Sequence, residues 1–108
     1  NTMSSNADFV QYVIDQCSGA GEITVKKMFG EYGLYCDGTF FGVVCDNRLF
    51  VKHTEAGAVS VPEAPLRPAY EGAKPSIYFE NVDDGESLSA LVRVTCNALS
   101  RSQTTKKR

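Results

Sequence analysis

Hydrophobic residues near the start of the chain recur at helical spacing. Asn6 or Ser5 is suited to cap a helix here, and the run from Ser18 to Gly21 is suited to end it. Its apolar face consists of Phe9, Val10, Val13, Ile14 and Cys17. A second helix is expected near the end of the chain, starting at Asp83 or Asp84. Its apolar stripe consists of Leu88, Leu91, Val92, Thr95, Cys96 and Leu99.

Between these helices, short β-rich runs are separated by residues typical of turns. The pairs Asp37-Gly38 and Asp46-Asn47 each separate two apolar runs, which is a strong signal for a β-hairpin. A type I′ turn needs positive φ at both central positions, and these residues tolerate it best. The pattern therefore predicts an antiparallel meander with strands at 24–29, 31–36, 39–45 and 48–52. A short helix at 54–61 and a last strand at 76–80 complete the prediction.

Two-residue turns also fix which side chains share a face of the sheet. If the register is regular, Leu34 opposes Phe41, and Val43 opposes Phe50. The first face then contains Tyr32, Leu34, Cys36, Thr39, Phe41, Val43, Cys45, Arg48, Phe50 and Lys52. The second face contains Gly33, Tyr35, Phe40, Gly42, Val44, Leu49 and Val51.

Both predicted faces are apolar at their centres, so both need a cover. Gly33 and Gly42 would oppose each other and form a shallow trough, so we expect the helices to pack on the second face. The first face has an apolar centre and a polar rim, which is typical of protein interfaces. We expect its contact residues to be Leu34, Phe41, Val43 and Phe50, with Lys52 at the rim.

The segment from residue 61 to residue 75 contains all four prolines of the chain. We expect an extended loop here, which is long for a connection inside a compact domain. Tyr70 and Leu66 in this loop are candidates to lie over the first face of the sheet.

Length and charge narrow the class of protein. The chain has 108 residues, which fits one domain at 7–100, with a leader at 1–6 and a basic, disordered tail at 101–108. Without that tail the body has seven basic and 13 acidic residues, so direct binding to nucleic acid is not favoured. No run reaches the ~18 apolar residues of a membrane span, and no signal peptide is visible, so we expect a cytoplasmic protein with no membrane partner.

Candidate catalytic and metal-binding residues are few. The four cysteines, Cys17, Cys36, Cys45 and Cys96, form no CxxC pair, and their spacing with His53 lacks the close pairs of structural zinc sites. We expect free, buried thiols rather than disulfides. The sequence therefore predicts no catalytic residue, no metal site and no cofactor.

The central run of the chain resembles a known family. The pattern K-M-F-G-x-Y-G-L-Y-x-D-G spans residues 27–38, and D-x-R-L-F-V-K spans residues 46–52. Together with the runs GAKPSIYFENVDD and SLSALVRVTCNAL, these motifs are similar to the N-terminal domain of the TfoX/Sxy family, bacterial regulators of natural competence. The resemblance covers about residues 7–100. It implies an α+β fold, an antiparallel β-meander with N-terminal and C-terminal helices packed on it, similar to the secretion-chaperone-like and YgaC-type group.

The resemblance also implies a non-enzymatic, cytoplasmic protein linked to transcriptional regulation through a protein partner. On this resemblance, we expect the chain to be a stand-alone N-terminal domain, without the C-terminal domain of the competence regulators. Lys27 and Lys52 are motif members with no packing role, so we expect them to act at the surface.

Two hypotheses follow for function. The first is a protein-interaction module that forms a homodimer through the first sheet face and contacts a transcription regulator. The alternative is a small-ligand-binding protein or a thiol-dependent enzyme with a pocket near Cys45, His53 or the proline-rich loop.

Overall fold

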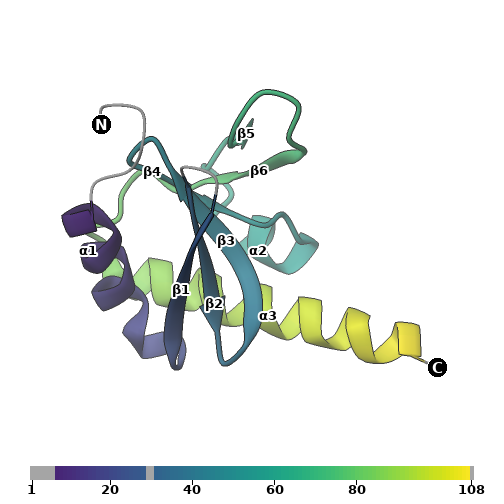
Figure 1. Cartoon of the computed structure of the whole chain (residues 1–108). Helices are drawn as coiled ribbons and strands as arrows, with labels where there is room; N and C mark the ends of the chain where they lie inside the picture. Colours follow the sequence, from purple (N-terminus) through teal and green to yellow (C-terminus); the bar gives the residue numbers. More distant parts are fainter. Residues whose placement is uncertain (1–6, 29–30, 108) are drawn as a thin grey trace.

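The computed structural model describes residues 7–28 and 31–107. Within them the elements are α1 (Ala7–Cys17), the 3-10 turn η1 (Ser18–Ala20), β1 (Ile23–Met28), β2 (Glu31–Cys36), β3 (Thr39–Cys45), β4 (Arg48–Val51), α2 (Glu55–Ser60), β5 (Leu66–Pro68), β6 (Pro75–Tyr78) and α3 (Gly85–Lys107). This is the predicted α+β fold, a six-stranded antiparallel sheet with the N-terminal and C-terminal helices packed against it (Figure 1). The predicted caps Ser5 and Asn6, the leader and the motif residues Phe29 and Gly30 lie outside the described residues.

The strands form one sheet in the order β1-β2-β3-β4-β6-β5, so the first four strands are the predicted meander. Both two-residue turns have the predicted left-handed backbone, with φ of 50° at Asp37, 86° at Gly38, 56° at Asp46 and 58° at Asn47. Residues that tolerate positive φ therefore position β2, β3 and β4 beside one another.

The predicted register between β2 and β3 was wrong beyond the first two pairs. Cys36 opposes Thr39 as expected, but Leu34 opposes Gly42 rather than Phe41, because a β-bulge interrupts the pairing between Leu34 and Tyr35. A bulge inserts one extra residue in one strand, here Phe41 in β3, and shifts every later residue pair of β2 and β3 by one position. Gly33 consequently opposes Val43, so the predicted trough of two facing glycines does not form.

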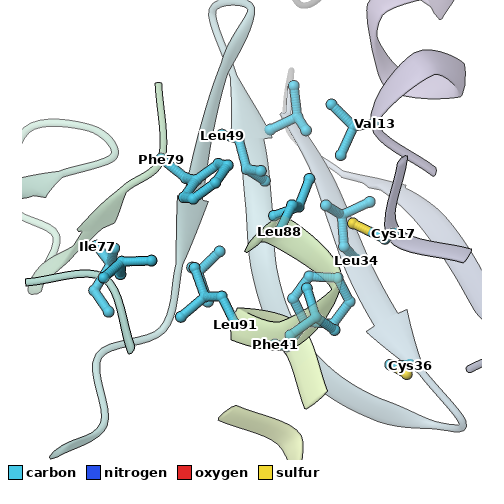
Figure 2. Packing of buried hydrophobic residues seen from close by; sticks show 14 of the residues in the cluster. Val13, Cys17, Leu34, Cys36, Phe41, Leu49, Ile77, Phe79, Leu88 and Leu91 are labelled. Carbon is cyan, nitrogen blue, oxygen red and sulfur yellow. The ribbon is translucent and has the colours of Figure 1, made fainter. Parts of the chain in front are cut away.

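This shift exchanges the two predicted faces in half of the sheet. Leu34 and Phe41 were expected on the face that contacts a partner, but both are fully buried in the core. Figure 2 shows them beside Leu88 and Leu91 of α3. The core side chains of the sheet are Leu34, Cys36, Phe41, Val44, Leu49, Val51 and Ile77, and those of the helices are Val10, Val13, Cys17, Leu88, Leu91 and Val92.

The helices all contribute to one side of the sheet. α1 packs against α3, α2 packs against α3, and α3 contacts β3 (Figure 1). The predicted stripe of α3 is confirmed, since Leu88, Leu91, Val92 and Thr95 are fully buried. α3 continues to Lys107, so it includes most of the segment that the sequence predicted as a disordered tail. None of the helices in the described ranges has the length and apolar character needed to cross a membrane.

The proline-rich segment is more ordered than predicted. Residues 66–68 form β5, which pairs with β6 at the edge of the sheet. Pro68 is tolerated there because an edge strand has one side without ladder hydrogen bonds. Leu66 opposes Ile77, which places it on the helix side of the sheet, so the prediction that it covers the other face was wrong.

Candidate functional site

The side of the sheet opposite the helices is the candidate interaction surface, called here the open face. Register and alternation place on it Thr24, Lys26, Glu31, Gly33, Tyr35, Phe40, Val43, Cys45, Arg48, Phe50, Lys52, Arg67, Ser76 and Tyr78. It combines aromatic side chains at its centre with cations around them. Among the residues of the open face, Phe50 is the large side chain with least exposure, at 4%.

Two aromatic pairs organise the centre of the open face. The rings of Phe50 and Tyr78 stack at a centroid distance of 5.4 Å, as expected for side chains directly opposite in β4 and β6. The rings of Tyr35 and Phe40 lie 5.3 Å apart, at an interplanar angle of 45°. Such pairs contribute about 0.5–1.5 kcal/mol beyond the burial of their area.

Two cations lie over these rings. The Lys52 Nζ atom is 5.0 Å from the centroid of Phe40, and the Arg67 guanidinium carbon is 5.9 Å from that of Tyr78. Attraction between a cation and an aromatic ring holds each cation near the sheet while its donors still reach outward. At the neighbouring turn Arg48 pairs with Asp46 at 3.2 Å, where both side chains are more than half exposed.

Three adjoining hollows surround the segment that joins β5 to β6. Hollow A has a volume of about 520 Å³ and is lined by Arg48, Phe50, Arg67, Pro68, Ala69 and Tyr78. Hollow B, of about 260 Å³, is lined by Phe40, Gly42, Val43, Phe50, Lys52, Ala69, Tyr70, Ala73, Lys74 and Ser76. Hollow C, of about 420 Å³, is lined by Lys52, His53, Leu66, Lys74, Pro75 and Ser76. Hollows A and B share Phe50 and Ala69, and hollows B and C share Lys52, Lys74 and Ser76, so the three adjoin. Hollows A and B lie on the open face, whereas hollow C continues around the edge of the sheet to Leu66.

The structure separates the residues predicted to contact a partner. Val43, Phe50 and Lys52 lie together on the open face and line hollow B. Lys27 is exposed, but it opposes Tyr32, whose side chain packs against the core, so Lys27 lies on the other side of the sheet. Tyr70 of the proline-rich segment lines hollow B, in agreement with its predicted position near this face.

Sequence reasoning missed several members of the open face. Tyr35 and Phe40 were assigned to the helix side, and Arg67 and Tyr78 were given no position on a face. The sequence does contain a feature that indicates the correct face for Tyr35 and Phe40. Gly42 follows two phenylalanines inside a strand, and an isolated glycine in a strand indicates a bulge.

The thiols of all four cysteines are free, as predicted, but they are not prepared for nucleophilic chemistry. Burial raises the pKa of Cys17 to about 12 and that of Cys96 to about 12. Burial also raises the pKa of Cys36, and that of Cys45, where the nearby Glu31 carboxylate acts in the same direction. A nucleophilic cysteine needs a lowered pKa, so the environment of each thiol disfavours the reactive thiolate.

Within residues 7–28 and 31–107, no group of three or more His, Cys, Asp or Glu side chains is placed to hold a metal ion. The donors that the sequence offered for zinc, the four cysteines and His53, are therefore not assembled into a site.

Comparison with known proteins identifies a family and a relative of this chain. The model of the family described as the TfoX N-terminal domain matches residues 15–99. A protein of Spirochaeta aurantia, named as an uncharacterized 12.7 kDa protein in the trpE 5′ region, is 35% identical over 98 residues, which cover 90% of this chain and 85% of that protein. The family match extends from the last turn of α1 into α3, and so includes the whole sheet and the open face.

Proposed function

Since the chain belongs to the TfoX N-terminal domain family, we propose that it is a non-enzymatic protein-interaction module whose contact surface is the open face. The observation that carries this proposal is the composition of that face. Aromatic side chains and Arg are what protein interfaces are enriched in, and the lysines contribute to the polar rim that surrounds such a centre.

The burial pattern supports the same proposal. The helices cover one side of the sheet and leave the aromatic residues of the other side only partly covered by the β5–β6 segment. Tyr35, Phe40, Val43 and Tyr78 are intermediate in exposure, and Tyr70 is 54% exposed. A partner that removed these side chains from water would gain about 25 cal/mol for each Å² of apolar surface.

We propose further that the partner belongs to the machinery of transcriptional regulation, as the resemblance to competence regulators implies. The homodimer expected from the sequence would form through the same open face, as the weaker of the two associations. Of the contact residues expected from the sequence, Val43, Phe50 and Lys52 are retained in this proposal, whereas Leu34 and Phe41 stabilise the core.

The alternative, a small-ligand-binding protein or a thiol-dependent enzyme, has less support. Hollow C brings His53 beside Lys52 and Lys74, but it contains no cysteine. Cys45, the cysteine on the open face, has a raised pKa, which disfavours its use as a nucleophile.

The experiment compares two substitutions that add the same charge at different surfaces. Val43→Asp alters the open face, and Val59→Asp alters α2, where Val59 is 78% exposed. Each variant is immobilised, and the proteins it retains from a lysate of the producing cells are identified by mass spectrometry.

We expect the unmodified chain and Val59→Asp to retain the same protein, and Val43→Asp to lose it. Circular dichroism confirms that each variant is folded. If all three chains retain the same proteins, the open face is not the contact surface and the proposal fails.

A further inference from the structure

The hollows of the molecule differ sharply in charge. Hollows A, B and C are lined by Arg48, Lys52, Arg67 and Lys74, together with His53, and no carboxylate lines any of them. A fourth hollow, of about 480 Å³, lies between the end of α2 and the start of α3. It is lined by Glu63, Glu80 and Asp84, and no cation lines it.

We propose that the open face binds an acidic segment of a partner protein along hollows A, B and C, an inference that rests on the function proposed above. The support for an acidic segment is its charge complementarity to the cations of these hollows. The four Lys and Arg residues of these hollows are grouped in a chain whose formal net charge is −2, so they are a local exception to the acidic body. Complementary charges set the specificity and the rate of association more than they set affinity.

The shape of these hollows indicates how such a segment would bind. Hollow B, the smallest, has an apolar floor that includes Phe40, Val43 and Phe50, so it accepts an apolar side chain. The cations Lys52 and Lys74 line hollow B as well as hollow C, and Arg67 lines hollow A. An extended segment that alternates apolar and acidic residues therefore matches both the floor and the rim.

Single-stranded nucleic acid is also anionic, but it fits the face less well. Its binding sites present open aromatic rings on which bases stack. Here Lys52 lies over the ring of Phe40 and Arg67 over the ring of Tyr78, while Phe50 is almost fully buried. The cations occupy positions that stacked bases would need, whereas carboxylates can bind the cations where they are.

A second copy of the chain is a poorer occupant for electrostatic reasons. In a two-fold symmetric contact the same patch meets itself. Lys52, Arg67 and Lys74 of one copy would then approach the same cations of the other, and like charges at an interface are unfavourable.

The test measures fluorescence anisotropy of a short labelled peptide in which Glu alternates with Leu and Phe. Two control ligands are the same peptide with Lys in place of each Glu, and labelled oligothymidylate. The variants Lys52→Glu and Arg67→Glu change the open face, and Lys27→Glu makes the same charge change on the other side of the sheet.

We expect the acidic peptide to bind, with an affinity that falls as salt is added. Lys52→Glu and Arg67→Glu should each weaken binding by about fivefold or more, and Lys27→Glu by less than about twofold. The Lys-containing peptide should not bind.

Three results would overturn the inference: no binding of the acidic peptide, equal effects of all three substitutions, or tighter binding of oligothymidylate. A tight homodimer that Val43→Asp dissociates would overturn it too, since a second copy would then be the occupant. The proposed function and this inference can fail separately. If the protein retained from the lysate is lost with Val43→Asp but kept with Lys52→Glu, the open face is still the contact surface, and only the acidic segment is ruled out.

Discussion

At the scale of single residues, Gly42 allows the backbones of β3 and β4 to approach each other closely. It lies at the bulge of β3, opposite Leu34 in β2 and Val51 in β4. A Cβ atom at this position would clash with the carbonyl oxygen of Phe50, which belongs to the backbone of β4. The close approach of two backbones therefore requires glycine here.

We predict that Gly42→Ala lowers the free energy of unfolding by about 2–3 kcal/mol, because the backbone of β4 must move to admit the methyl group. Urea denaturation measures this loss. Gly19→Ala is the control, since its Cβ would meet the Ser89 hydroxyl oxygen at 3.1 Å and a side chain can adjust. Equal losses in the two variants would show that the approach of β3 to β4 at Gly42 is not constrained as described.

The cysteines give a second prediction at this scale. Cys17 is fully buried and its pKa is raised to about 12, whereas Cys45 is half-buried on the open face. We expect iodoacetamide at neutral pH to label Cys45 first and Cys17 only on unfolding, with mass spectrometry identifying each site. Labelling should accelerate as pH rises, because the thiolate is the reactive form. Rapid labelling of any cysteine at neutral pH would instead favour the thiol-dependent alternative.

At the scale of elements, the start of α3 connects the two terminal helices. The Ser87 amide donates to the Asp84 Oδ1 atom at 3.2 Å, which caps α3. From α1, the Gln16 side-chain amide donates to the Val82 carbonyl oxygen at 2.7 Å, and the Tyr12 hydroxyl donates to the Asp83 carboxylate. The sequence predicted that this helix starts at Asp83 or Asp84. In the fold, Asp84 caps α3 and Asp83 contacts α1.

This cap predicts how stability depends on pH. Hydrogen bonds from Ser87 lower the pKa of Asp84 below its ordinary value of 3.8. The carboxylate therefore stabilises the folded chain fully above pH 3.8, and this contribution is lost as pH falls through the lowered pKa. We expect Asp84→Asn, which can cap without titrating, to lose less stability than the unmodified chain on acidification, as measured by thermal unfolding. Asp84→Ala lacks the cap and should be less stable than the unmodified chain at neutral pH. If the unmodified chain and Asp84→Asn lost equal stability in acid, the role of Asp84 as a titrating cap would be contradicted.

At the scale of the whole molecule, the sheet separates two surfaces of different character. The helices cover one side, and the acidic hollow near Glu63, Glu80 and Asp84 lies beside them. The open face carries the aromatic pairs and the cations of hollows A, B and C. The molecule thus has a face with grouped cations on a body that is acidic overall.

This separation leads to a prediction about self-association. If two copies meet through the open face, their cations approach one another, so we expect the dimer to be weak and to strengthen as salt screens the repulsion. Sedimentation velocity at low and high salt measures this. A dimer that weakens as salt is added would indicate contacts between opposite charges, and therefore a different interface.

The sequence by itself determined the element order apart from β5, both tight turns and the burial of the terminal helices. These features depend on local preferences, such as positive φ at residues 37–38 and 46–47, and on periodicity within one helix. It also determined that the sheet is apolar on both sides and that the motifs match one family.

Only the tertiary structure decided which side chains face the helices. Phe41 and Phe50 lie on opposite sides because an extra residue in β3 shifts the pairing, and Arg67 and Tyr78 join the open face because β5 and β6 pair beside β4. A shift of one residue reverses the orientation of every later side chain in a strand, and pairing between distant strands is fixed by packing rather than by local sequence.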